Sequence, residues 1–515
     1  MNNTYLGIEF GSTRIKACLI DGGYNVIAVG GYDWENKFEN GYWTYSLDDI
    51  HKGLKKAFKS LKADYKEKFG KTLTSVTSIG ISGMMHGFLA FDKDGNLLTP
   101  FRTWRNTVTA RAASILSEKF SFNIPQRWSI AHLYEAILND EPYIKDIAHI
   151  TTLAGYIHFC LTGERKMGVG EASGMFPVEN GNYNAKMLYT FRNLVKDKVD
   201  WDISEILPEI KVAGEKSGVL TEEGAKFIDE DGDLKAGIPF CAPEGDAGTG
   251  MVATNAVTPG VGNVSAGTSI FAMLVLKEKL KNVYEQIDVV TTPAGDDVAM
   301  VHCNNCCAEL DAFVNMFGEF AILLGANADK STLYNTLYKN TVNADEDCGG
   351  ITAYNYLSGE HITGIKKGSP MYFRTVDSKM NLANFMKSLL YSSVASLSIG
   401  MEILFDKEKA QADRFLAHGG LFKVEGVAQQ ILSDALNTPV SVMETAGEGG
   451  AFGMALLAAY MIEGKETLGK WLENKVFSAL ASKEVAPDQD GVTGFKEYMK
   501  RYKAGLSAEK ELEKI

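Results

Sequence analysis

The stretch YLGIEFGSTRIKACLID, residues 5–21, decides the fold of the first part of the chain. Apolar residues alternate with polar or small ones before and after Gly11-Ser12-Thr13, which is the pattern of two half-buried β-strands. The small residues between the strands predict a tight hairpin turn. A turn without bulky side chains lets its backbone N–H groups point at one place, so it can hold a phosphate without net positive charge.

A similar stretch, GNVSAGTSIFAMLVL, occurs at residues 262–276. Here Gly267-Thr268-Ser269 separates two apolar runs, and about half the chain lies between Gly11 and Gly267. Equivalent turns in two half-chains predict two related domains. We place the boundary after residue 245, within IPFCAPEGDAGTG (residues 238–250), because prolines and glycines interrupt regular structure there.

The segments after the first hairpin indicate an α/β fold. DGGYNVIAVG, residues 21–30, predicts a third strand. Ser46 and Asp49 form the pattern of a capping box, which predicts a helix that begins there and extends to about Phe69. SVTSIGISG, residues 75–83, is rich in β-branched residues and predicts a further strand.

The composition is that of a globular protein with two or three domains, since 45% of the 515 residues are hydrophobic and 23% are charged. The net charge of −13 disfavours nucleic acid and anionic membranes as partners. The apolar run GGAFGMALLAAYMI, residues 449–462, is too short to span a bilayer. We see no basic leader, and seven cysteines fit reduced thiols, so a cytoplasmic location is expected.

Two opposed turns would bind a polyphosphate from two sides, and the nucleotide would then lie in the cleft between the domains. Hydroxyl groups at Ser12, Thr13 and Thr268 add donors, and Lys16 could reach a phosphate. Each turn alone could equally be an ordinary hairpin. The glycines of AHGGLFKVEG (residues 417–426) and GEGGAFG (residues 447–453) allow close backbone approach to a flat ligand such as adenine.

Six motifs in this order resemble the FGGY family of carbohydrate kinases, and within it the xylulokinase-like members. The motifs are GIEFGSTRIKACLID (7–21), ISGMMHG (81–87), GDAGTGMVAT (245–254), SAGTS (265–269), HGG (418–420) and GEGGAFGMALLAA (447–459). The likeness extends from about residue 5 to about residue 460. It implies an α/β fold of two ribonuclease-H-like (actin-like ATPase) domains with an inter-domain cleft. It also implies transfer of the γ-phosphoryl group of ATP to a sugar or polyol hydroxyl, with Mg²⁺.

The resemblance also implies site residues. Residues 1–245 would form the sugar-binding domain with the first phosphate turn, and residues 246–515 the ATP-binding domain. Asp246 would be the general base: a carboxylate is ionised at neutral pH and can accept the hydroxyl proton late in a loose transition state. The residues expected to contact ATP are Gly11, Ser12, Thr13, Lys16, Gly267, Thr268, Gly419, Gly420, Lys423 and Gly449. Those expected to contact the sugar are Met85, His86, Trp104, Arg105, Asn106, Glu244 and Asp246. Mg²⁺ would be held at Glu9 and Asp246.

The sequence departs from the family pattern in two places. Glu9 stands where the family usually has Asp, so the metal contact would shift or pass through water. In TWRNTVTAR, residues 103–111, the usual acid after the tryptophan is missing and Arg105 is present. Arg105 could favour a polar or acidic sugar, or only pair with Glu244. We therefore expect a ketopentose such as D-xylulose, with L-ribulose, another ketose, a sugar acid or a polyol as alternatives.

Two further interpretations remain. A sensor of the same fold would bind ATP and sugar without catalysis and could dispense with the base, so Asp246 distinguishes the two functions. HCNNCC, residues 302–307, fits buried thiols better than a zinc site, which needs four ligands. The expected partners are the sugar and ATP, and the sequence leaves a homodimer open.

Overall fold

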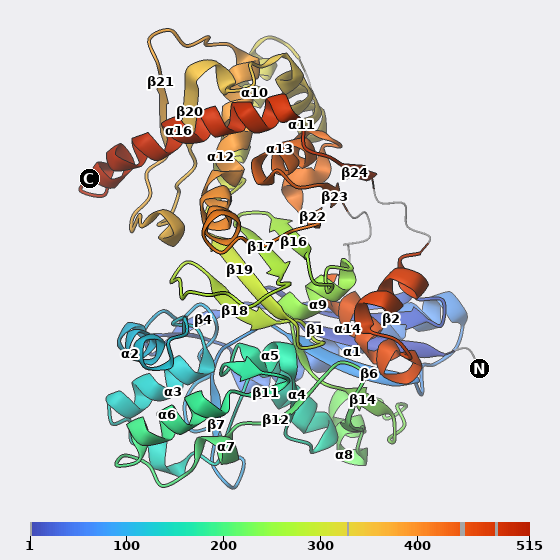
Figure 1. Cartoon of the computed structure of the whole chain (residues 1–515). Helices are drawn as coiled ribbons and strands as arrows, with labels where there is room; N and C mark the ends of the chain where they lie inside the picture. Colours follow the sequence, from blue (N-terminus) through green and yellow to red (C-terminus); the bar gives the residue numbers. More distant parts are fainter. Residues whose placement is uncertain (1–2, 327–328, 443–448, 479–482) are drawn as a thin grey trace. The chain divides into compact units, whose positions relative to one another are not determined.

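The computed structural model describes residues 3–326, 329–442, 449–478 and 483–515 (Figure 1). The chain forms two compact units. The first consists of Met1–Thr258, Val289–Val298 and Thr445–Leu480, and the second of Pro259–Asp288, Ala299–Glu444 and Ala481–Ile515. The expected boundary after residue 245 lies inside the first unit, because helix α9 (Asp246–Ala253) packs on helix α14 (Gly449–Glu463) of that unit.

The first unit is built on a mixed sheet in the order β13-β14-β6-β1-β2-β3. Its strands are β1 (Thr4–Phe10), β2 (Arg14–Asp21), β3 (Val26–Asp33), β6 (Ser78–Gly83), β13 (Lys216–Val219) and β14 (Pro239–Cys241). β1 and β2 are antiparallel, with Glu9 opposite Lys16, which confirms the predicted hairpin. β6 runs parallel to β1, and the short strand β15 (Glu244–Gly245) pairs with the end of β6.

Two helices cover opposite faces of this sheet. Helix α14 lies so close to β1 that a Cβ atom on Gly7 would overlap the backbone of Ala451 and Ala455. Helix α1 (Leu47–Phe69) approaches β3 equally closely at Gly30. The predicted cap of α1 is confirmed, since the Ser46 hydroxyl accepts a hydrogen bond from the Asp49 N–H (3.0 Å).

The remaining elements of the first unit are short helices and two-stranded pairings. The helices are α2 (Ala110–Phe120), α3 (Ser129–Leu138), α4 (Leu153–Thr162), α5 (Val169–Ser173), α6 (Ala185–Val195), α7 (Ile203–Ile206), α8 (Glu222–Ile228) and α15 (Leu468–Trp471). The strands are β4 (Lys37–Glu39), β5 (Tyr42–Thr44), β7 (Leu89–Phe91), β8 (His149–Thr151), β9 (Lys166–Gly168), β10 (Val178–Glu179), β11 (Asn182–Tyr183) and β12 (Glu209–Lys211).

The second unit repeats the same hairpin in a sheet of order β19-β17-β16-β22-β23-β24. Its strands are β16 (Val261–Ala266), β17 (Ile270–Val275), β19 (Asp297–Cys303), β22 (Arg414–His418), β23 (Val440–Val442) and β24 (Lys483–Val485). β20 (Ile351–Tyr354) pairs with β21 (Met371–Arg374). Of β18 (Asp288–Thr291), which precedes β19 in the chain, only Asp288 belongs to this unit. β16 and β17 are antiparallel, and β22 runs parallel to β16. The second predicted hairpin is therefore confirmed.

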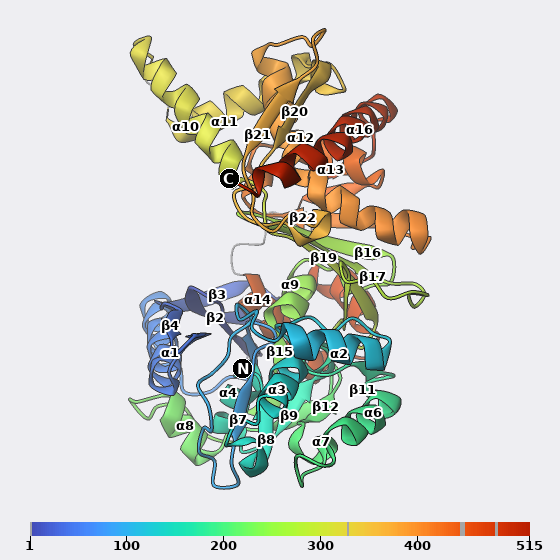
Figure 2. The ribbon, with the colours of Figure 1, turned by 90° about the vertical axis from the view of Figure 1, so that its left-hand side faces the viewer.

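In the described residues, the α-helices of the second unit are α10 (Ala308–Leu323), α11 (Lys330–Lys339), α12 (Leu382–Glu402), α13 (Val427–Leu436) and α16 (Gln489–Leu512), of which α12 and α13 pack on the sheet. α10 and α11 pack against each other at the edge of this unit (Figure 2). Within the described residues, one helical segment, Leu382–Lys407, is long and apolar enough to cross a membrane, but 83% of its apolar window is buried. That burial is typical of a core helix.

Candidate active site

The first turn is held from behind by aromatic side chains. The Gly11 N–H donates to the Arg14 carbonyl (3.1 Å) and closes the turn. The Trp34 indole donates to the Gly11 carbonyl (2.8 Å), and the Tyr45 hydroxyl donates to the Ser12 carbonyl (2.5 Å). The Trp34 and Tyr45 rings stack, with their centroids 4.0 Å apart. These contacts fix the carbonyl side of the turn.

The other side of the turn has unused donors. Neither Ser12 nor Thr13 uses its backbone N–H in a hydrogen bond to any residue that the structure describes. The indole N–H of Trp104 donates to the Ser12 hydroxyl (3.1 Å), so the structure joins an expected sugar-side residue to the expected phosphate turn. The turn can therefore present N–H groups to an anion beside a polar aromatic surface.

The two residues after Trp104 have different surroundings. The Arg105 guanidinium lies over the Trp43 ring, 3.9 Å from its centroid, and no ion pair with Glu244 is seen in the described part of the chain. Asn106 is buried, and its amide accepts from the Trp43 N–H (2.8 Å) and donates to the carbonyls of Trp43 (2.8 Å) and Thr103 (3.0 Å). These bonds give Asn106 a structural role in the loop.

Asp246 begins helix α9 directly after strand β15. Its Oδ1 atom accepts a hydrogen bond from the Met85 N–H (3.1 Å), which brings the motifs GDAGTG and GMMHG together. Burial raises the pKa of Asp246 to about 6, against the lowering effect of the Met85 N–H. The carboxyl group is thus mostly ionised at neutral pH and is a stronger base than an ordinary aspartate.

The side chain of Glu244 is hydrogen-bonded to backbone N–H groups of the first unit. It is 1% exposed, and its carboxylate accepts from the N–H groups of Gly170 (3.3 Å) and Glu171 (2.9 Å) at the start of α5. Burial raises the pKa of Glu244 to about 8. These contacts position α5 against β15, and they account for Glu244 without a sugar contact.

Glu171 belongs to the same cluster, and sequence reasoning missed it. Its side chain is fully buried, and neither carboxyl oxygen forms a hydrogen bond of good geometry with a described residue. One of its oxygens lies where a Cβ atom on Gly245 would be. Burial, together with the negative charges of Asp246 and Glu244, raises the pKa of Glu171 well above its usual range. Asp246 is therefore the first of these three carboxyl groups to ionise.

His86 is a neutral histidine in a strained backbone position. Its φ is +70°, a left-handed conformation that a non-glycine residue adopts where the surroundings require it. Its Nδ1 lies 3.2 Å from the Gly174 carbonyl, and its ring stacks on Trp128. Burial and the nearby Arg127 hold the pKa of His86 well below its usual range. With the proton on Nδ1, Nε2 is left as a hydrogen-bond acceptor.

Glu9 and Thr249 border a small space at the start of α14. A Cβ atom on Gly450 would come within 2.6 Å of Glu9 Oε1 and 2.7 Å of Thr249 Oγ1, so both oxygens lie next to this glycine. The neighbouring Gly449, expected near adenosine, lies beside Lys16 Nζ and Glu9 Oε2. Oxygen donors of this kind suit Mg²⁺, which keeps several waters and takes one or two carboxylates. No group of three or more His, Cys, Asp or Glu side chains in the described residues could hold a metal ion.

The second turn lies in the second unit. The Gly267 N–H donates to the Ser269 carbonyl (2.8 Å), and this hydrogen bond closes the turn. Gly419, the first glycine of the HGG motif, has a φ of +112°, and a Cβ atom at this position would overlap the Ala266 carbonyl. The motifs SAGTS and HGG are therefore in direct contact. Gly420 and Lys423, which are also expected to contact ATP, are the first and last residues of the 3₁₀ turn that follows Gly419.

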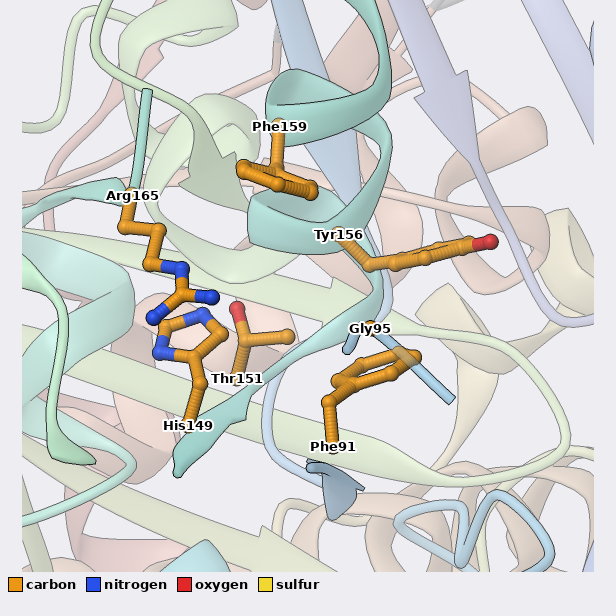
Figure 3. A pocket seen from close by; sticks show the side chains of 7 residues that line it. All are labelled: Phe91, Gly95, His149, Thr151, Tyr156, Phe159 and Arg165. Atoms are coloured by element: carbon orange, nitrogen blue, oxygen red, sulfur yellow. The ribbon is translucent and has the colours of Figure 1, made fainter. Parts of the chain in front are cut away.

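A recess lies elsewhere in the first unit (Figure 3). It is lined by Phe91, Gly95, His149, Thr151, Tyr156, Phe159 and Arg165. Burial and the charge of Arg165 lower the pKa of His149 to about 4. None of the expected site residues lines this recess.

Comparisons with known proteins show the family and the fold. The N-terminal domain model of the FGGY family of carbohydrate kinases matches residues 4–253, and its C-terminal domain model matches residues 262–462. The chain is 22% identical over 471 residues to the xylulose kinase of Haemophilus influenzae, which covers 87% of this chain and 89% of that protein. Its fold is similar to the solved structures of xylulose kinase from Rhodospirillum rubrum (TM-score 0.79, 16% identity, 98% and 99% coverage) and gluconate kinase from Lactobacillus acidophilus (TM-score 0.78, 15% identity, 99% and 100% coverage).

Proposed function

Because this chain belongs to the FGGY family of carbohydrate kinases and is itself a sugar kinase with the two-domain actin-like ATPase fold, we propose that it phosphorylates a ketopentose such as D-xylulose, with Asp246 as the general base. The observation that supports Asp246 as the base is its geometry: the Met85 N–H fixes one carboxylate oxygen at the partly exposed start of α9, and the carboxyl cluster around it agrees with this role. Glu171 and Glu244 are fully buried and hold their protons to higher pH, whereas Asp246 is partly exposed and ionises with a pKa of about 6.

Asp246 accepts the proton of the sugar hydroxyl as that oxygen bonds to the γ-phosphorus and the bond to the ADP oxygen breaks. In a loose transition state this proton moves late, so positioning and charge neutralisation contribute most of the catalysis. The Met85 N–H orients the carboxylate. The neutral His86 supplies a ring nitrogen for a sugar hydroxyl, and Trp104, whose N–H donates to Ser12, supplies an aromatic face.

The phosphates of ATP are assigned to the two turns and to Lys16. The unused N–H groups of Ser12 and Thr13 support this role for the first turn. Mg²⁺ would be held by Glu9, directly or through water, and by Asp246, and would neutralise phosphate charge when bound. Gly449 lies beside Glu9 and Lys16, so we assign it to the phosphates, and Gly419, Gly420 and Lys423 to the nucleotide side of the second unit.

A sugar acid is the second candidate substrate. Arg105 follows Trp104, whose indole donates to Ser12 in the first turn. The Arg105 guanidinium stacks on Trp43 and forms no ion pair with a described residue, so it remains able to bind a carboxylate. The relatives named xylulose kinase support our choice of a ketopentose as the first candidate.

The test is ADP release over a panel of ketoses, polyols and sugar acids, with wild type and Arg105→Ala. We expect sugar-dependent release, highest with a ketopentose and nearly unchanged in the variant. A sugar acid as best substrate, with activity lost in Arg105→Ala, would favour the second candidate. ADP release that no sugar stimulates would instead favour the sensor, which binds ATP and sugar but transfers no phosphate to the sugar.

A further inference from the structure

Two adjacent cysteines lie beside the second turn. The Sγ atoms of Cys306 and Cys307 are 3.5 Å apart. Cys306 is buried, whereas Cys307 is half-buried at the start of α10, so a reagent can reach the pair from solvent through Cys307. Neither thiol has a part in the proposed phosphoryl transfer.

The backbone of this pair supports the turn directly. The Cys306 N–H donates to the Thr268 carbonyl (3.0 Å), and the Cys307 N–H donates to the Gly267 carbonyl (3.1 Å). The Cys306 carbonyl in turn accepts from the Asn355 amide (2.9 Å). The peptide that joins the two cysteines is therefore fixed on both sides by hydrogen bonds.

We propose that Cys306 and Cys307 form a vicinal dithiol site that trivalent arsenicals bridge and disulfide oxidants close, and that closure as a disulfide deforms the turn at Gly267-Thr268. In oxidation, each thiol loses a proton and the pair gives two electrons to a small-molecule disulfide, which leaves as two thiols. With an arylarsine oxide, two As–S bonds form and the oxygen leaves as water. We expect this deformation to weaken ATP binding, and that expectation rests on the proposed function of the turn.

The coupling follows from geometry. Neighbouring Cα atoms are about 3.8 Å apart, whereas those of ordinary disulfides are about 4.4–6.8 Å apart. A ring closed between adjacent cysteines therefore forces the connecting peptide to rotate. That rotation removes the Cys307 N–H from the Gly267 carbonyl and the Cys306 carbonyl from the Asn355 amide, and so loosens the turn from this side.

The first experiment measures capture of phenylarsine oxide by the reduced full-length chain, by mass spectrometry. We expect one equivalent bound by the wild type and by Cys160→Ser, a matched variant of another half-buried thiol, and none by Cys307→Ser. Circular dichroism checks that each variant is folded. Equal capture by Cys307→Ser would overturn the site, as would oxidation by glutathione disulfide that links Cys303 to either neighbour.

The second experiment measures ATP affinity calorimetrically before and after oxidation by glutathione disulfide, with mass spectrometry to show the Cys306–Cys307 disulfide. We expect at least a tenfold loss in wild type and Cys160→Ser that dithiothreitol reverses, and no effect of oxidation on Cys307→Ser. A Cys306–Cys307 disulfide with unchanged ATP affinity would overturn the coupling. Capture does not depend on phosphoryl transfer, so a chain that captures arsenic yet phosphorylates no sugar would refute the proposed function and leave the dithiol site standing.

Discussion

The Oδ1 atom of Asp246 lies 3.1 Å from the backbone nitrogen of Met85, although 161 residues separate the two in the sequence. This hydrogen bond joins the end of β6 to the start of α9 within the first unit. It holds one carboxylate oxygen at a defined place while the carboxyl group stays partly exposed. A base that must meet a sugar hydroxyl needs this combination of orientation and access.

The pH dependence of catalysis follows from the pKa of Asp246. The carboxyl group accepts a proton only when it is ionised, and burial raises its pKa to about 6. Activity is therefore present above that value and is lost as the pH falls through it. We expect kcat/KM to fall about tenfold per pH unit below about pH 6. An acid limb near pH 4 would contradict the assignment.

Glu9→Gln tests the magnesium site. The amide keeps the size of the side chain but removes the charge that attracts the cation, so we expect the Mg²⁺ concentration for half-maximal activity to rise about tenfold or more. Glu39→Gln, an exposed position on β4, is the control and should leave the titration unchanged. Superimposable magnesium titrations for Glu9→Gln and wild type would exclude Glu9 as a ligand.

Gly450→Ala tests whether the space beside Glu9 and Thr249 is needed. The added Cβ atom would come within 2.6 Å of Glu9 Oε1, so that side chain must move. We expect the KM for ATP and the Mg²⁺ requirement to rise about tenfold. We also expect a loss of about 1–3 kcal/mol in the free energy of unfolding, because the buried Thr249 hydroxyl lies 2.7 Å from the new Cβ atom and its β-branched side chain is stiff. Gly250→Ala, with no atom within 4 Å of the new methyl group, is the matched control. Equal kinetics in both variants would contradict this role.

Gly419→Ala tests the second turn. Its φ of +112° disfavours any side chain, and the Cβ atom would overlap the Ala266 carbonyl, which is backbone and cannot move cheaply. We expect a loss of about 1–3 kcal/mol in the free energy of unfolding and weaker ATP binding. Gly420→Ala meets no atom within 4 Å and should leave the melting temperature nearly unchanged. A melting temperature for Gly419→Ala equal to wild type would show that the contact is not required.

Much of the fold could be predicted because its signals are local. The alternation around Gly11 and Gly267 predicts both hairpins, and the Ser46 cap predicts the start of α1. The division into units could not be predicted in the same way. It depends on α14 packing on β1, where Gly7 allows close approach of segments more than 400 residues apart.

The site was predictable where residues lie in recognisable motifs, and not where long-range packing decides their environment. Asp246 and Met85 come together from two such motifs. Glu171 has no local signal, since its character arises from burial beside Gly245. Asn106 and Glu244 were expected to face a sugar, but hydrogen bonds to distant backbone groups account for both.

The most direct test of the central claim is detection of the phosphorylated sugar by ³¹P nuclear magnetic resonance, with wild type and Asp246→Asn at saturating ATP and sugar. The amide matches the carboxyl group in size and can still accept the Met85 hydrogen bond, but it cannot take a proton. We expect sugar phosphate with wild type, and a rate at least 100-fold lower with Asp246→Asn, while calorimetry finds ATP affinity within about threefold of wild type. Comparable rates of sugar phosphate formation by the two proteins would contradict the account.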